Sequence, residues 1–167
     1  IKIGNIFFAE QGYPQARKYY KIAEQQAIIG NDIYGRSVIY MNYGMIFEKQ
    51  KRFQQALAMY KISMKYRLLS DRFIANSATY IKLANVYTFL NQPDSSAYYI
   101  RRAEESFRKG ESLNLVFDFP FSLSFTKSKL YFLLKQDELA FQHLHRAKLH
   151  ALKLKLFPDY AEASLAE

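Results

Sequence analysis

The chain has 167 residues, a length that suits one domain of ordinary size with a sizeable core. Half of the residues are hydrophobic, with 14 Tyr and 14 Phe, which excludes a disordered tail. The absence of Cys excludes disulfides, thiolate metal sites and a Cys nucleophile in this stretch. The net charge of +9 permits an acidic partner, nucleic acid or an anionic membrane surface without choosing among them.

We expect no membrane-spanning helix and no signal peptide within this stretch. No apolar run approaches the ~20 residues that a membrane-spanning helix needs, and the first residues lack the pattern of a signal peptide. Because the chain begins without Met, we expect a piece of a longer protein. The cytoplasm is the favoured compartment, and the periplasm stays open because a preceding segment would carry any export signal.

A period of 40 residues runs through the chain. The small residues Gly4, Gly44 and Ala84 stand 40 residues apart, and each is followed at fixed distances by an aromatic, a small, a large and another small residue. These positions hold Phe7, Phe47 and Tyr87, then Ala16, Ala56 and Ser96, then Tyr20, Tyr60 and Ile100, then Ala23, Ser63 and Ala103. A fourth copy follows 44 residues after the third and holds Tyr131, Ala140, Leu144 and Ala147.

Spacings of three and four residues place these side chains on one face of an α-helix. A break near Gly12, Lys51, Pro93 and Gln136 divides each copy into two helices. We therefore predict antiparallel helical hairpins over residues 1–30, 33–70, 72–109 and 113–156, and the start of a further helix at 158–167. Pro93 is expected to open a helix, and Pro120 is expected to break or kink one.

The small residues indicate how the two helices of a hairpin approach each other. Gly44 and Ala56 are expected to leave a gap between the helices, and Phe47 and Tyr60 are expected to fill it. The predicted core is therefore a regular alternation of small and large residues.

This pattern resembles the tetratricopeptide repeat. The matching residues are Tyr43-Gly44-x2-Phe47 and Ala56-x3-Tyr60-x2-Ser63, with the same spacings in the next copy. The period of 40 departs from the usual 34, and Leu68 and Arg108 stand where the family has a closing Pro. The resemblance implies an all-α, right-handed superhelix (an α-solenoid) that forms a single domain over residues 1–167. Longer repeats of this kind are similar to those of bacterial regulators.

The resemblance also implies a concave groove, lined by the first helix of each hairpin, that receives a peptide or an extended partner segment. The residues expected there are Asn5, Phe8, Asn42, Met45, Lys49, Lys82, Asn85, Phe89 and Lys129. Amide side chains can hold a peptide backbone by paired hydrogen bonds, and lysines suit carboxylates. The carboxylate clamp of chaperone-binding members would also need charge at two places that here hold Ile1 and Ala78.

Other kinds of site find less support in the sequence. His143, His145 and His150 lie close together, but no carboxylate or Cys completes a metal-ligand set at the right spacing, so no metal or cofactor is expected. Basic stretches such as residues 148–156 interleave with aromatics, yet the aromatics follow the core period. Phosphate-binding loops, paired acids and nucleophile motifs are absent, so we expect no catalysis.

The expected function is therefore a non-catalytic domain that binds a peptide or protein. By the resemblance, it would be the sensory or scaffolding part of a bacterial transcriptional or two-component regulator. Two alternatives stay open: self-association through the ends of the array, which would make the chain purely architectural, and the less favoured binding of nucleic acid.

Overall fold

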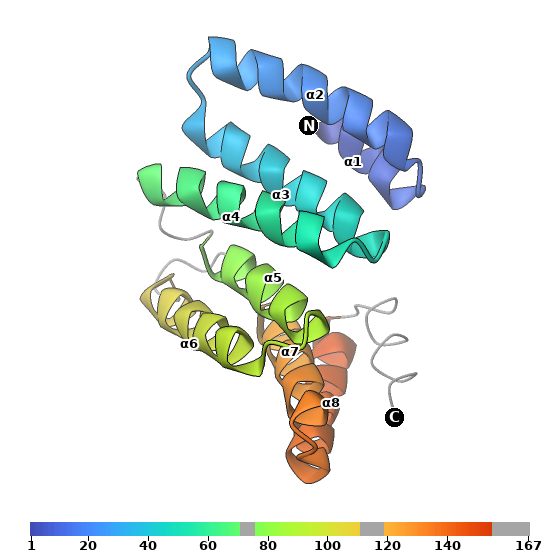
Figure 1. Cartoon of the computed structure of the whole chain (residues 1–167), viewed down its shortest axis with the longest axis vertical. Helices are drawn as coiled ribbons and strands as arrows, with labels where there is room; N and C mark the ends of the chain where they lie inside the picture. Colours follow the sequence, from blue (N-terminus) through green and yellow to red (C-terminus); the bar gives the residue numbers. More distant parts are fainter. Residues whose placement is uncertain (71–75, 111–118, 155–167) are drawn as a thin grey trace. The chain divides into compact units, whose positions relative to one another are not determined.

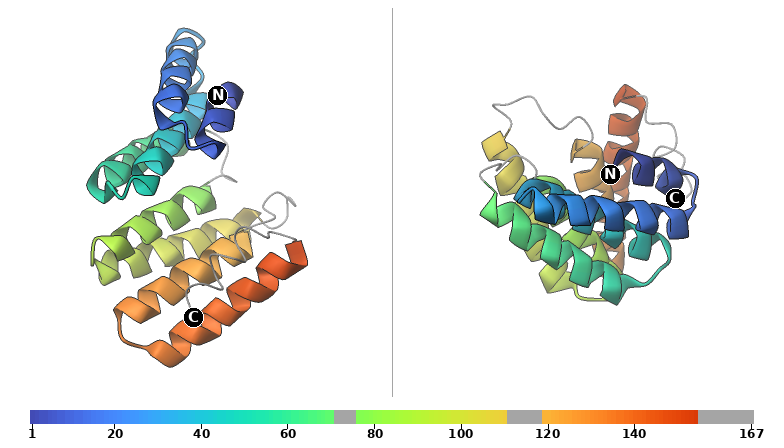
Figure 2. Two further views of the ribbon diagram at one scale, coloured as in Figure 1. Left: turned by 90° about the vertical axis from the view of Figure 1, so that its right-hand side faces the viewer. Right: turned by 90° about the horizontal axis from the view of Figure 1, so that it is seen from above.

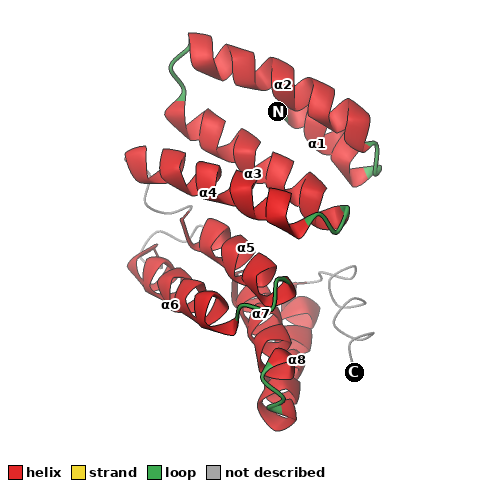
Figure 3. Cartoon of the chain, viewed as in Figure 1, coloured by secondary structure: helices red, strands yellow, loops and turns green. Residues whose placement is uncertain are grey.

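The computed structural model describes residues 1–70, 76–110 and 119–154. These residues form eight α-helices and contain no strand (Figures 1 and 3). The chain divides into two compact units, Ile1–Ala75 and Asn76–Glu167. The prediction of an all-α protein is confirmed, whereas the prediction of one continuous array concerns the placement of the two units and stays a prediction.

Each unit contains two helical hairpins. The first unit holds α1 (Lys2–Ala9), α2 (Tyr13–Ile29), α3 (Ile33–Lys49) and α4 (Phe53–Leu69). The second unit holds α5 (Asn76–Phe89), α6 (Pro93–Gly110), α7 (Phe119–Leu133) and α8 (Asp137–Leu154). The two helices of a hairpin run antiparallel, as Figure 2 shows for α3 with α4 and for α7 with α8. The predicted helix at 158–167 lies outside the described residues.

The prolines lie at helix starts, as their chemistry requires. Pro93 is the first residue of α6 and Pro120 is the second residue of α7. In the first turn the missing N–H of proline removes no hydrogen bond from the helix. The sequence predicted that Pro120 would break or kink a helix, and in the structure it lies where a helix begins.

The turn inside each hairpin has the same geometry four times. The backbone N–H of the residue before the second helix donates to the carbonyl five residues earlier, over 2.7 to 2.9 Å. The donors are Gly12, Arg52, Gln92 and Gln136, and the acceptors are Phe7, Phe47, Tyr87 and Tyr131. The residue before each donor has a positive φ, between 57° and 59°. The same turn thus recurs at the predicted spacing of 40 residues, and of 44 at the fourth copy.

The repeated small residues are contact points between the helices of a hairpin. A Cβ added to Gly44 would lie 2.4 Å from Cε1 of Tyr60, and one added to Gly4 would lie 2.5 Å from Cε1 of Tyr20. Both distances are too short for real carbon atoms, so only glycine allows each tyrosine ring to lie against the first helix. Tyr60 is fully buried there.

The second unit uses a smaller pair at the same positions. Ala84 takes the place of the glycine and packs in one cluster with Ile100, which takes the place of the tyrosine. The fourth hairpin has the buried residues Ser128 and Leu144 at these positions. Glycine thus stands where the partner is a tyrosine, and a residue with a Cβ stands where the partner is a smaller aliphatic side chain.

One part of the packing prediction was wrong. Phe47 does not fill the gap beside Gly44, where the three nearest side-chain atoms all belong to Tyr60. The ring of Phe47 is half-buried and lies beneath the guanidinium groups of Arg17 and Arg52, at 5.6 and 4.8 Å. Phe47 is three residues beyond Gly44, so its side chain leaves the helix about 60° around the axis from the direction in which Gly44 faces Tyr60.

None of the described helices is both long enough and apolar enough to cross a lipid bilayer.

The close contact of Gly44 with Tyr60 leads to a stability prediction. Gly44→Ala should lower the free energy of unfolding by about 1–3 kcal/mol, because the new methyl group overlaps the Tyr60 ring. Urea denaturation followed by far-UV circular dichroism would measure the change.

The double variant Gly44→Ala with Tyr60→Ile provides the matched control, because it copies the pair of Ala84 and Ile100. It should lose roughly 1 kcal/mol less than the sum of the two single variants. Additive losses would show that the two positions do not share one contact.

Candidate functional site

In the first unit, two asparagines of the predicted groove lie side by side. Nδ2 of Asn42 on α3 donates to Oδ1 of Asn5 on α1 over 3.0 Å. The same oxygen accepts the hydroxyl of Tyr20 on α2 over 2.9 Å. Asn5 is exposed, whereas Asn42 is only 7% exposed. Asn5 therefore forms the accessible end of a hydrogen-bonded chain that joins three helices.

The rings of Tyr20 and Tyr60 lie against Gly4 and Gly44, and this close approach brings their hydroxyls to side chains of the first helices. Tyr20 passes Gly4 to reach Asn5, and Tyr60 passes Gly44 to donate to Oε2 of Glu48. Burial raises the pKa of Tyr20, and burial together with the Glu48 carboxylate holds the pKa of Tyr60 well above its ordinary value. Both hydroxyls therefore stay protonated as donors near neutral pH.

The other predicted groove residues of the first unit differ in how exposed they are. Phe8 is half-buried and packs against Tyr13 of α2, with 5.9 Å between the ring centroids. It belongs to the partly buried shell of the hydrophobic core. Met45 is half-buried and Lys49 is exposed. Phe8 therefore supports the first hairpin, while Asn5 and Lys49 offer the most accessible polar groups.

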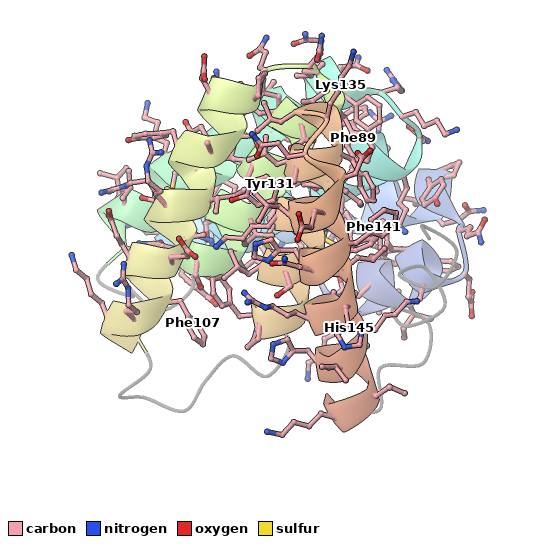
Figure 4. The ribbon with its side chains drawn as sticks, turned by 90° about the horizontal axis from the view of Figure 1, so that it is seen from below. Phe89, Phe107, Tyr131, Lys135, Phe141 and His145 are labelled. Atoms are coloured by element: carbon pink, nitrogen blue, oxygen red, sulfur yellow. The ribbon has the colours of Figure 1, made fainter. Side chains whose placement is uncertain are left out.

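In the second unit, a lysine lies among aromatic rings. Nζ of Lys129 on α7 lies 4.1 Å from the ring centroid of Phe125 and 5.3 Å from that of Phe89 on α5. Phe89 is 47% exposed, so this cation–π cluster reaches the surface. Figure 4 shows Phe89 on the same side of the unit as Phe141, away from Phe107. Of the other two predicted residues, Lys82 is half-buried and Asn85 is buried.

The structure thus brings together two pairs of predicted groove residues, Asn5 with Asn42 and Phe89 with Lys129. Sequence reasoning missed Tyr20 as the partner of Asn5 and Phe125 as the partner of Lys129, and it missed the contact of Glu48 with Tyr60. The repeat itself held the signal: Phe125 lies three residues before the small position of its helix, and Glu48 lies four residues after Gly44. At these spacings, side chains lie on the same side of the helix as the small residue.

A second polar cluster in the first unit was not predicted. Glu24 of α2 accepts the hydroxyl of Tyr40 over 2.6 Å and that of Tyr43 over 3.4 Å. The hydrogen bond to Glu24, then burial, raise the pKa of Tyr40 to about 12. Burial and the same carboxylate raise the pKa of Tyr43 as well. Tyr40 also stacks on Tyr66 of α4, and the Arg36 guanidinium lies 4.3 Å from the Tyr66 ring centroid.

The histidines do not come together as a metal site. The ring of His143 stacks on Tyr131 at 5.3 Å, and its Nδ1 is buried without a hydrogen-bond partner. Burial and the nearby Lys127 and Arg146 lower the pKa of His143, which favours the neutral ring. Across residues 1–70, 76–110 and 119–154, no three His, Cys, Asp or Glu side chains are placed to hold a metal ion.

Many basic side chains lie on aromatic rings of the chain itself. Besides Arg17, Arg52, Arg36 and Lys129, Arg102 lies over the Tyr80 ring at 5.6 Å and donates to its hydroxyl over 3.4 Å. A cation that already lies on a ring has part of its charge stabilised there. These groups therefore contribute to helix packing as well as to the net charge.

No protein-family model, curated protein or solved structure matches this chain.

The Glu24 cluster predicts a fall in stability at high pH. Because the folded pKa of Tyr40 is raised to about 12 from its ordinary 10.0, the folded chain keeps its proton where the unfolded chain loses it. The stabilisation is complete below pH 10 and is lost as the pH rises from about 10 to about 12.

Urea midpoints measured across this pH range would show the fall, and Glu24→Gln provides the control. The variant removes the carboxylate that raises the pKa of Tyr40 and Tyr43, so its midpoint should change less with pH than that of the wild type. Equal pH dependence in the two proteins would contradict the role assigned to Glu24.

Proposed function

We propose that this chain is a non-catalytic, tetratricopeptide-like right-handed superhelix that binds a peptide or protein segment along its first helices. The proposal is supported by the recurrence of one hairpin, with the same turn and the same small-to-large core contact. The observation that carries it is the Asn42–Asn5 hydrogen bond, which joins the first helices of two successive hairpins.

Each unit presents its own patch, and the two patches differ in chemistry. Asn5 and Asn42 make no further side-chain hydrogen bonds within the described residues, so the Asn5 amide nitrogen can donate to a peptide carbonyl. The exposed ring of Phe89, with the Lys129 ammonium beside it, offers an apolar contact next to a positive charge. A backbone carbonyl of a ligand would suit the first patch, and an apolar or acidic side chain would suit the second.

Such a domain would act by binding. A ligand that prefers one curvature or assembly of the array shifts the population toward it, by as much as its affinities for the two states differ. The role as the sensory or scaffolding part of a bacterial transcriptional or two-component regulator rests on the resemblance of the long repeats alone.

Self-association is the second candidate, and exposed apolar residues of α8 favour it. Leu139, Phe141, Leu149 and Leu152 are each between 41% and 53% exposed. Light scattering over a concentration series would detect it, since a groove binder can remain monomeric. Binding of nucleic acid, the third candidate, requires an affinity that falls steeply as salt rises.

Peptides selected from a random library against the immobilised chain would test the groove. The double variant Asn42→Ala with Lys82→Glu should weaken the selected peptides by roughly tenfold or more, because it removes the amide pair and reverses a charge. Fluorescence anisotropy of labelled peptides would measure the change.

The exposed Lys65 of α4 provides a control outside the first helices, since Lys65→Glu makes the same charge reversal as Lys82→Glu. Its affinity should match that of the wild type, and circular dichroism should show that all variants fold. Full binding by the Asn42 and Lys82 double variant would rule out the groove.

A further inference from the structure

One exposed face of α2 and of α4 carries the same kind of side chains at the same places in the repeat. On each helix, five positions lie within about 100° of arc, and those of α4 stand 40 residues after those of α2. The positions hold Lys18, Lys21, Gln25, Ile28 and Ile29 on α2, and Ala58, Lys61, Lys65, Leu68 and Leu69 on α4. All of these residues are exposed. We call the two sets the second-helix stripes.

Each second-helix stripe ends in two exposed aliphatic residues. Ile28 and Ile29, the last residues of α2, are 54% and 79% exposed. Leu68 and Leu69, the last residues of α4, are 64% and 61% exposed. Figure 1 shows α2 and α4 ending at the same edge of the first unit, on the left. Exposed aliphatic residues that gather at one edge, unlike single ones, mark a contact surface.

Neighbouring hairpins do not cover these positions. The α2 stripe is exposed although α3 and α4 follow it, and the α4 stripe is exposed although α1 and α2 precede it. Because the two hairpins follow one repeat, neither a preceding nor a following hairpin takes this place. On α6, the counterparts of Leu68 and Leu69 are Arg108 and Lys109, which are exposed as well. The fold therefore accepts charged residues where the first unit has Ile and Leu.

The second-helix stripes carry positive charge and no carboxylate. Helix α4 contains no Asp or Glu. The one acidic residue of α2, Glu24, is half-buried and accepts hydrogen bonds from Tyr40 and Tyr43. Residues 1–70 as a whole hold eleven Lys and Arg against four Asp and Glu. An anionic surface would therefore meet a face of one sign.

The mixture of Lys with aliphatic residues suits a lipid bilayer better than a protein or a nucleic acid. Protein interfaces are rich in aromatic residues and Arg and poor in Lys. Nucleic acid is bound through its phosphates and by stacking on its bases, to which aliphatic side chains add little. The stripes contain no aromatic residue and no Arg. Helices that lie on a membrane combine Lys with large apolar side chains.

We propose that the second-helix stripes bind the surface of an anionic lipid bilayer. The four aliphatic residues at the ends of α2 and α4 enter the boundary between headgroups and acyl chains, and the lysines lie against the anionic headgroups. This surface belongs to the second helices of the hairpins. It is separate from the groove of the first helices and does not depend on the function proposed for that groove.

The probes are sucrose-loaded vesicles of phosphatidylcholine alone and of phosphatidylcholine mixed with phosphatidylserine. Sedimentation of the vesicles with increasing lipid gives the affinity of the whole chain. The wild type should bind the vesicles that contain phosphatidylserine saturably and the neutral vesicles weakly. The affinity should fall as salt rises, because salt screens the attraction between the lysines and the headgroups.

A first pair of variants tests the aliphatic residues without changing the charge. Ile29→Ser with Leu69→Ser should weaken binding to the phosphatidylserine vesicles roughly tenfold or more, because both side chains would leave water on binding. Leu134→Ser with Leu139→Ser makes the same change at two residues of the second unit that are each 41% exposed. This control should bind within about twofold of the wild type.

A second pair tests the lysines at equal net charge. Lys21→Gln with Lys65→Gln should weaken binding roughly tenfold or more, because each Lys close to an anionic leaflet adds to the affinity. Lys51→Gln with Lys135→Gln removes the same charge from two hairpin turns, where Gln11 already takes the equivalent place. This control should stay within about threefold of the wild type.

Four results would overturn the proposal. They are no binding of either vesicle by the wild type, equal binding by the variant of Ile29 and Leu69 and its control, a wild-type dimer that this variant dissociates, and tighter binding of a DNA duplex than of vesicles. The second would leave only attraction by the net charge. The third, seen by light scattering without vesicles, would make a second copy of this chain the occupant, and the fourth would assign the lysines to nucleic acid.

Discussion

The contact between one small residue and one large residue inside each hairpin is the constraint on which the rest of the structure depends. A ring such as that of Tyr60 can lie against the first helix only because Gly44 has no Cβ. Where the large residue is Ile100, the small one is Ala84 and gains a methyl group. The two positions thus vary together in size, and the same turn closes each of the four described hairpins.

The same contact also places polar groups of the second helices beside the first helices. Because the rings pass the glycines, the hydroxyls of Tyr20 and Tyr60 emerge beside Asn5 and Glu48 on the first helices. The two hydroxyls orient the Asn5 and Glu48 side chains by hydrogen bonds, and burial raises the pKa of both tyrosines so that the hydroxyls stay protonated. The small residues Gly4 and Gly44, which allow the core to pack, therefore also determine which hydrogen bonds Asn5 and Glu48 make.

Much of the fold could be predicted from the sequence, because packing between neighbouring helices requires small and large residues at regular spacings. The spacing of Gly4, Gly44 and Ala84 and the breaks near Lys51 and Pro93 were sufficient to place the helices and turns. The candidate site was predicted less well. Asn5 and Asn42 were expected in one groove, but their hydrogen bond, the burial of Asn42 and the position of Lys129 over Phe125 depend on side-chain orientation.

The sequence by itself determined the helical period, the hairpin turns and the identity of the core positions, since these follow from local spacing and residue size. Only the tertiary structure decided which neighbours fill each gap: Tyr60 rather than Phe47 lies beside Gly44, and Phe47 lies under two arginines. It also decided that Glu24 accepts hydrogen bonds from two tyrosines. These features join residues that no period relates, because they depend on how one helix is rotated against the next.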